Sequence, residues 1–303
     1  MTGLVLKNVV EISLESCRCE RLPPLGKLTS LKILKISSMD SLKYFNHESY
    51  GDGEDSFPAL EILNFNVMPS LEKWTIVDRE EIFPCLRNLH IEACPKLTEF
   101  PFLRTLEILT IWEGSNERLI RSVINVTSLS DLEILGSELK ILPDKLFSNF
   151  KHLRFLNMSY SYIKTLPESI SGLQHLQTLK LNYCEEICKL PKRLKHMRNL
   201  TCLDIKGCDS LTSMPANMGQ LTCLQRLSIF IVGQDEGYQI SELKELNLGG
   251  ELSIKELENV RNSEDAKRAN LKSKLDLISL NLCWSDSNKE SIPKNVEEIL
   301  ENL

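Results

Sequence analysis

The sequence predicts an α/β solenoid, an arc with a parallel β-sheet on its concave side and irregular or short-helical segments on its convex side. A motif of Leu-x-x-Leu-x-apolar, later followed by an apolar-Pro pair, occurs three times between residues 153 and 215. Its strand leucines, Leu156, Leu179 and Leu203, are 23 and 24 residues apart. One such unit cannot bury its own leucines, whereas stacked copies bury each other's. This pattern and period are typical of leucine-rich repeats.

The same leucine pattern predicts about twelve strands along a single domain spanning residues 1–303. We expect irregular repeats over 1–103, regular repeats over 104–232, and longer repeats with helical insertions over 233–303. The predicted strands are centred on Ile12/Leu14, Leu34/Ile36, Leu63/Phe65, Leu89/Ile91, Leu109/Ile111, Leu132/Ile134, Leu156/Met158, Leu179/Leu181, Leu203/Ile205, Leu227/Ile229, Leu252/Ile254 and Leu280/Leu282.

Other segments interrupt this rhythm. Tyr50–Ser56 and Val232–Gln239 are rich in Gly and acidic residues, which predicts loops. The segment Ser263–Leu275 is predicted to be a helix capped by Ser263, with acidic residues in its first turn. A second helix is expected over Pro293–Leu303, because its apolar residues recur on one face.

Ten cysteines are present, and four of them follow strands at the same repeat position: Cys17, Cys94, Cys184 and Cys208. We expect these thiols to face the interior and to bond the turn backbone of the next coil. The N-terminus shows no clean apolar run for a signal peptide, so reduced thiols are expected. This predicts a cytoplasmic protein, with the nucleus as a second location.

Composition and motifs argue against several functions. The net charge of −6 disfavours a general nucleic-acid surface, and no apolar stretch is long enough to span a membrane. The five histidines and the cysteine pairs lack the spacing of a zinc site. No nucleophile and base stand in a recognisable motif. We therefore predict that the chain is not an enzyme and uses no metal or other cofactor.

The side chains that point outward between the strand leucines are the remaining functional candidates. Aromatic residues beside charged residues suit a protein-binding surface. The alternative interpretation is an ordinary solvent-exposed face without a ligand. The residues predicted to form a concave protein-binding face are Trp112, Phe155, Tyr160, Lys180, Tyr183, Lys206, Arg226 and Phe230.

Four segments carry a family resemblance: residues 41–74, 83–101, 218–260 and 262–285. Through them the chain resembles the leucine-rich repeat region of plant intracellular immune receptors, the nucleotide-binding leucine-rich-repeat disease-resistance proteins of the coiled-coil class. The resemblance implies a sensor and autoinhibitory region in plant defence. It also implies three kinds of partner: a pathogen effector, a guarded host protein, or the nucleotide-binding domain of the same receptor.

The family's phosphate-binding loop is missing from this sequence. The Gly26-Lys27 pair would require glycine at position 21 and a hydroxyl at position 28, where Arg21 and Leu28 stand. We therefore expect no ADP or ATP binding by this chain. The order of the repeats also looks rotated relative to the family, and the ends lack polar capping repeats. Three alternatives stay open: a truncated or non-functional resistance-gene remnant, a non-immune leucine-rich repeat adaptor, and an extracellular leucine-rich receptor or inhibitor.

Overall fold

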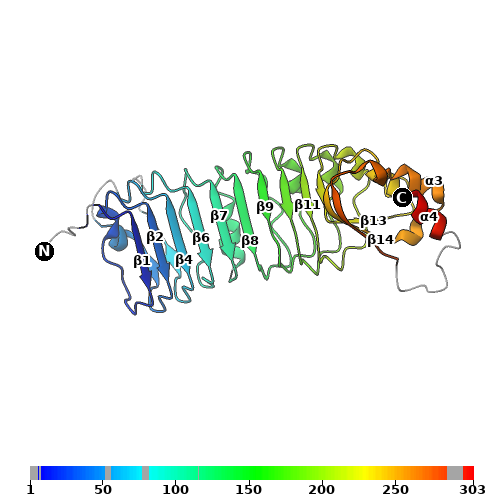
Figure 1. Cartoon of the computed structure of the whole chain (residues 1–303). Coiled ribbons are helices and arrows are strands. Elements are labelled where there is room, and N and C mark those ends of the chain that lie inside the picture. The colour runs from blue at the N-terminus through cyan, green and yellow to red at the C-terminus, as the bar shows by residue number, and fades with distance from the viewer. Residues whose placement is uncertain (1–5, 7, 52–55, 77–81, 115, 285–295) are drawn as a thin grey trace. The chain divides into compact units, whose positions relative to one another are not determined.

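The computed structural model describes residues 6, 8–51, 56–76, 82–114, 116–284 and 296–303 (Figure 1). The chain forms two compact units. Unit 1 comprises Met1–Leu139 and Ser148–Leu153, and unit 2 comprises Lys140–Phe147 and Arg154–Leu303.

Unit 1 contains a parallel sheet whose strands follow one another in chain order. Its strands are β1 (Glu11–Glu15), β2 (Ile33–Ser37), β4 (Ile62–Asn66), β6 (Asn88–Glu92), β7 (Ile108–Trp112) and β8 (Asp131–Leu135). The strands pair in register, so that Leu34, Leu63 and Leu89 lie side by side. Alternate side chains point to opposite faces of a strand, which buries both apolar residues of the motif from β2 to β8. These strands confirm the predicted positions.

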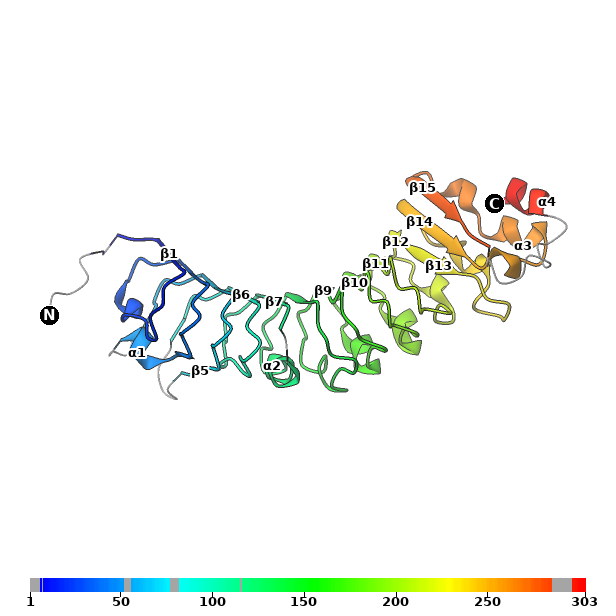
Figure 2. The same ribbon diagram turned by 90° about the horizontal axis from the view of Figure 1, so that it is seen from below.

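The connections of unit 1 return on the side opposite the strands (Figure 2). They include the 3₁₀ turn η1 (Leu25–Lys27), a short parallel pair, and two helices. The pair consists of β3 (Tyr44–Phe45) and β5 (Lys73–Trp74), and the helices are α1 (His47–Tyr50) and α2 (Glu117–Val123). Asn116 caps α2 by accepting a hydrogen bond from the backbone N–H of Leu119 at 3.0 Å.

An aromatic core lies between these connections. Its rings have centroid separations from 5.1 to 6.5 Å. The Tyr50 hydroxyl lies 2.9 Å from the carbonyl oxygen of Thr75, which satisfies the polar tip of a buried ring. The prediction of a loop over Tyr50–Ser56 is wrong at its start, because Tyr50 ends α1 and is buried; residues 52–55 lie outside the described part. The buried rings are Phe45, Tyr50, Phe57, Phe65, Trp74 and Phe83.

Unit 2 contains two parallel sheets. The first consists of β9 (Phe155–Asn157), β10 (Thr178–Lys180), β11 (Cys202–Asp204) and β12 (Arg226–Leu227). The second consists of β13 (Ile229–Ile231), β14 (Gly250–Lys255) and β15 (Leu277–Leu282). The strand predicted around Leu227/Ile229 is thus divided between the two sheets. The parallel repeats of both units confirm the predicted leucine-rich repeat solenoid.

The connections of unit 2 are mostly 3₁₀ turns. They are η2 (Glu168–Gly172), η3 (Lys192–His196), η4 (Met218–Gln220), η5 (Ile240–Leu243), η6 (Leu257–Asn259) and η7 (Leu271–Ser273). Prolines precede η2 and η3, where a missing N–H costs no hydrogen bond. Figure 2 shows these turns on the side of unit 2 opposite β9–β12.

The predicted C-terminal helices need correction. Helix α3 spans Ser263–Arg268 and is capped by Asn262. Ser263 instead donates a hydrogen bond to the Glu298 carboxylate of α4 (Val296–Asn302) at 2.7 Å. The helix ends early because Asn270 adopts a left-handed backbone conformation before η7. The start of the second predicted helix, residues 293–295, lies outside the described residues.

Most repeats turn sharply after the strand through one left-handed residue. The αL residue lies two positions after the second apolar residue of the motif, for example Ala93 after Ile91 and Tyr183 after Leu181. The next side chain then points into the solenoid. At that position Cys184 donates to the carbonyl oxygen of Met158 at 3.1 Å, and Cys208 donates to that of Leu181 at 3.0 Å.

These thiol bonds correct one prediction. The thiols of Cys94, Cys184 and Cys208 are buried as expected. Cys184 and Cys208 bond the preceding repeat, not the next one, whereas Cys94 donates to the carbonyl oxygen of Glu92 in its own repeat at 3.2 Å. Cys17 is exposed, and the strand before it, β1, is the first strand of its sheet within the described residues. Among the helices that the structure describes, none is long and apolar enough to cross a membrane.

Candidate protein-binding face

Unit 2 presents a surface at its first sheet that we call the strand face, defined by Phe155, Tyr160, Lys180, Tyr183, Lys206 and Arg226. Phe155, Lys180 and Arg226 lie in strands, at positions that alternate with buried leucines. Tyr160 and Tyr183 occupy the left-handed turn position after β9 and β10. All six side chains are exposed or half-buried.

Two tyrosines form the most exposed aromatic feature of the strand face. Tyr160 is 59% exposed and Tyr183 is 44% exposed, and their rings stack 5.2 Å apart at an interplanar angle of 10°. The ring of Tyr183 also lies against the backbone of Gly207, the turn residue of the following repeat. The stack is therefore held against the following repeat while both side chains remain largely exposed.

Basic side chains lie beside these rings. The Lys180 ammonium is 5.5 Å from the centroid of the Phe155 ring, a cation–π geometry. The Lys206 ammonium is 3.7 Å from a carboxylate oxygen of Glu251, and both side chains are largely exposed. An ion pair of this kind contributes little to stability, which leaves Lys206 able to meet a partner. The strand face is therefore of mixed charge and partly aromatic.

Polar side chains between the rings connect successive repeats. The Asn157 side-chain oxygen accepts from the Ser159 hydroxyl at 2.7 Å, and the Ser159 hydroxyl oxygen accepts from the backbone N–H of Asn182 at 3.0 Å. The Asn182 side chain donates to the Asp204 carboxylate at 2.7 Å and accepts from the backbone N–H of Lys206 at 2.9 Å. These bonds fix the strand face, because most of them join neighbouring strands or turns.

Two residues that were predicted to belong to the protein-binding face, Phe230 and Trp112, are not part of the strand face of unit 2. Phe230 is 1% exposed, so the prediction that it projects from the surface is wrong. It lies in β13, where Ile229 and Ile231 are buried as well, because this strand starts the second sheet of unit 2. Trp112 belongs to unit 1, at the end of β7, and is 43% exposed.

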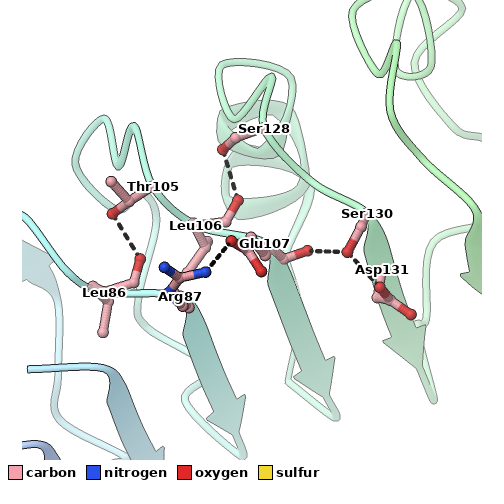
Figure 3. Close-up of polar contacts among 8 residues, drawn as sticks. All are labelled: Leu86, Arg87, Thr105, Leu106, Glu107, Ser128, Ser130 and Asp131. Carbon is pink, nitrogen blue, oxygen red and sulfur yellow. Dashed lines mark hydrogen bonds and ion pairs between the residues drawn. The ribbon is translucent and has the colours of Figure 1, made fainter.

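Unit 1 has a row of inter-repeat polar contacts at the entrance to its strands (Figure 3). The hydroxyl groups of Thr105 and Ser128 donate to the carbonyl oxygens of Leu86 and Leu106, at 2.8 and 2.6 Å. This row was not predicted from the sequence, although its Ser and Thr positions precede consecutive strands. The neighbouring shallow groove is lined by Arg87, Arg104, Thr105, Glu107, Ser128 and His152.

Near this row, the charged side chains of unit 1 mostly interact with other side chains of the same unit. Arg87 forms an ion pair with Glu107 at 2.7 Å, and the Arg104 guanidinium lies over the Phe102 ring at 5.9 Å.

Within the described part of the chain, no three His, Cys, Asp or Glu side chains are grouped closely enough to hold a metal ion. Cys17 and Cys19 have sulfur atoms 3.1 Å apart, and both are free thiols.

Sequence comparison identifies related proteins. Residues 144–303 match the family model described as "Leucine-rich repeat region". Disease resistance protein RGA2 of Solanum bulbocastanum is 45% identical over 177 residues, which cover 51% of this chain and 18% of that protein. RPP13-like protein 1 of Arabidopsis thaliana, also named for disease resistance, is 38% identical over 221 residues, covering 68% of this chain and 21% of that protein. The chain thus spans about a fifth of the length of these relatives.

Solved structures share the fold. The leucine-rich repeat domain of the type III effector XopL superposes with a TM-score of 0.54 at 23% identity, covering 72% of this chain and 75% of that one. A leucine-rich repeat protein of Leptospira interrogans gives a TM-score of 0.52 at 18% identity, covering 91% of this chain and 72% of that one. At these identities the likeness concerns the fold alone.

Proposed function

Because the chain belongs to the leucine-rich repeat region family, we propose that it recognises a protein partner through the strand face of unit 2. The relatives named for disease resistance support a role in plant defence. The finer proposal is that the chain is a sensor and autoinhibitory region of a nucleotide-binding leucine-rich-repeat receptor that acts in the cytoplasm or the nucleus. Its partner is then a pathogen effector, a guarded host protein or the receptor's own nucleotide-binding domain.

The single observation that carries the proposal is the stack of Tyr160 on Tyr183. Two exposed aromatic rings, fixed by stacking and by contact with Gly207, offer contact area with little loss of side-chain entropy on binding. Tyrosine is enriched among the residues that dominate protein interfaces, since its ring is apolar and its hydroxyl can bond. The adjoining Lys180 and Lys206 add charges that can select a partner.

The strand face favours a partner of mixed character. Lys206 lies near Glu251, and Asp204 accepts from Asn182, so acidic groups lie beside the basic residues of the face. A mixed pattern selects a partner by matching individual charges, because like charges placed opposite each other are repelled. No nucleotide is required, which agrees with the missing phosphate-binding loop around Gly26-Lys27. We propose a non-enzymatic recognition domain without a cofactor.

The experiment is affinity capture from leaf tissue with the full chain, followed by identification of the bound proteins. The Tyr160→Ala/Tyr183→Ala variant should lose a partner that the wild type retains. The matched control is Tyr162→Ala, because this tyrosine is 54% exposed but is not part of the stack. If all three proteins capture the same set of partners, the strand face is not the recognition surface.

A second arm tests the autoinhibitory role. A separately expressed nucleotide-binding domain from a nucleotide-binding leucine-rich-repeat receptor is mixed with the wild type, and the complex is measured by co-precipitation. Charge reversal at Lys180 and Lys206 should weaken this association and, in a joined receptor, raise cell death in leaf tissue. If the charge-reversal variant associates as well as the wild type and the receptor stays in its resting state, the strand face is not the regulatory contact. The capture experiment then still decides whether this face binds other proteins.

A further inference from the structure

A second surface of unit 2 has a different chemistry. The connection between β10 and β11 carries five basic side chains, Lys189, Lys192, Arg193, Lys195 and Arg198, and no acidic residue between positions 188 and 199. We call these five residues the basic arc. Four of them are exposed, and Lys195 is half-buried. This local excess of positive charge contrasts with the net charge of −6 of the whole chain.

The basic arc is not neutralised by its surroundings. The segments of the flanking connections from 165 to 175 and from 213 to 223 contain a single Asp, Glu, Lys or Arg, which is Glu168. Its carboxylate accepts from the backbone N–H groups of Lys192 and Arg193, at 2.9 and 3.3 Å. Glu185 and Glu186 precede the basic arc in its own connection, and Glu186 lies near Lys140 and Lys164, at 4.0 and 3.9 Å. The ion pairs described in unit 2 involve other basic residues, namely Lys140, Lys164, Lys206, Lys244, Lys255 and Arg268.

The backbone of the basic arc is held firmly. Leu190, Leu194 and Met197 are buried beneath it, at 6%, 0% and 2% exposure, so the 3₁₀ turn η3 is anchored to the core. Glu168 fixes the start of that turn through its two backbone contacts. A fixed backbone keeps the basic side chains close together although they repel one another, and less order has to be created when a partner binds.

The burial of the apolar side chains beneath the basic arc also indicates which class of partner this surface binds. Peripheral membrane binding uses apolar side chains that enter the lipid, and the apolar residues of this arc are turned inward. Single-stranded nucleic acid is bound through aromatic rings that stack on bases, and residues 188–199 contain no Phe, Tyr or Trp. Arginine pairs well with carboxylates because its guanidinium can donate two parallel hydrogen bonds, and Arg193 and Arg198 supply two such groups.

We propose that the basic arc is a second docking surface, which binds an acidic segment of a protein partner rich in Asp and Glu. It lies on the side of unit 2 opposite β9–β12, whereas the strand face lies at those strands (Figure 2). The two surfaces can therefore be inactivated separately. Loss of one docking function leaves the other measurable.

The test measures binding of a fluorescein-labelled peptide of about eight alternating Glu and Gly pairs by fluorescence anisotropy at low salt, where charge contacts are strongest. The full chain should bind it, and added salt should weaken binding because the contact is between charges. The Lys189→Gln/Arg193→Gln/Arg198→Gln variant should bind at least about tenfold more weakly. Glutamine removes charge without placing a new carboxylate beside Glu168.

The control variant is Lys96→Gln/Arg118→Gln/Lys151→Gln, which removes the same number of charges from exposed positions of unit 1. It should keep the wild-type affinity to within about twofold. Thermal unfolding of both variants checks that they are folded, and the basic-arc variant should be as stable as the wild type or slightly more stable. Equal weakening by the two variants would overturn the proposal.

Two rival probes separate the classes of partner. Vesicles containing phosphatidylserine test lipid binding, and an oligothymidine strand tests nucleic-acid binding. We expect neither to be bound as tightly as the acidic peptide at the same salt concentration. Tighter binding of either rival, lost in the basic-arc variant, would overturn the assignment to an acidic protein segment.

Discussion

The ring of Tyr183 lies so close to Gly207 that a Cβ atom on the glycine would come within 2.6 Å of the tyrosine Cδ1. Gly207 also has a φ of +71°, in the left-handed region that side chains disfavour. This one contact joins the turn geometry of the solenoid to the orientation of the exposed aromatic stack. The residue at the turn of one repeat, Gly207, therefore influences the orientation of an exposed ring in the preceding repeat, that of Tyr183.

Gly207→Ala should therefore destabilise the fold and move Tyr183. The left-handed backbone alone costs about 1–2 kcal/mol for a residue with a Cβ, and the clash adds to it. The measurement is urea unfolding, with tyrosine fluorescence as a report on the stack. Gly172→Ala is the control, because a Cβ added to Gly172 would have no other atom within 4 Å. Equal stability of the two variants would show that the ring and the turn are not coupled.

Leu179→Ala tests the core of the repeats. Leu179 is fully buried in β10 between Leu156 and Leu203, so truncation should reduce the free energy of unfolding by about 2–5 kcal/mol. Lys180→Ala, one residue along, should cost at most about 1 kcal/mol, since it removes only the cation–π contact with Phe155. A thermal midpoint that does not move with Leu179→Ala would contradict the assigned register.

The repeat fold was predictable because a leucine pattern carries the same information in every copy. Leu63, Leu89 and Leu109 lie in the predicted strands, since the position of each is set by local alternation. The candidate face followed from the same alternation, which places Lys180 outward beside Leu179. The sequence therefore predicted which side chains point outward wherever the repeat was regular, and their role in binding stays a prediction.

The failures occur where tertiary structure overrides the repeat. Phe230 has the spacing of an outward residue, yet it is buried because β13 begins a separate sheet. Tyr50 stands at the start of a Gly/Asp-rich stretch, yet it packs into an aromatic core contributed by distant connections such as Phe83. The Tyr160–Tyr183 stack forms only when two neighbouring repeats are in register and both tyrosines lie in left-handed turns. The sequence pattern of a single repeat shows neither the register nor the turn conformation.

The buried cysteines predict a loss of stability in alkaline solution. Burial raises the pKa of Cys184 to about 11 and that of Cys208 to about 12, from an ordinary value of 9.0. Above pH 9 the unfolded chain loses these protons while the folded chain keeps them, so the unfolded state binds fewer protons. The resulting stabilisation is complete below pH 9 and decreases as the pH rises toward 11 and 12.

Urea unfolding between about pH 8 and about pH 10.5 measures this dependence. The wild type should lose stability more steeply with pH than Cys184→Ala/Cys208→Ala, whatever the two proteins' stability at neutral pH. The variant lacks the two thiol–carbonyl hydrogen bonds at every pH, which lowers its whole curve without changing the slope. Parallel curves for wild type and variant would contradict the expected protonation of the buried thiols.

Amide exchange should reveal how the repeats support one another. Strands β10 and β11 are paired on both sides, and their central residues Leu179 and Leu203 are fully buried. Strand β15 is the outer strand of its sheet, and its residues Ile278 and Leu280 are 88% and 41% exposed. In a nearest-neighbour solenoid, a repeat with one interface opens more readily than a repeat with two.

Backbone amides of β15 that bond to β14 should therefore exchange faster than the bonded amides of β10 and β11. In unit 1, β1 should likewise exchange faster than β6, because among the described strands β1 pairs with β2 alone, and its residue Ile12 is half-buried. Strand β14 is the internal control, since it pairs with both β13 and β15 while lying in the same sheet as the edge strand. Hydrogen exchange followed by mass spectrometry can resolve these strands. Uniform protection from β13 to β15 would show that the sheet opens as one cooperative unit, because an edge strand that opened separately would exchange ahead of its neighbours.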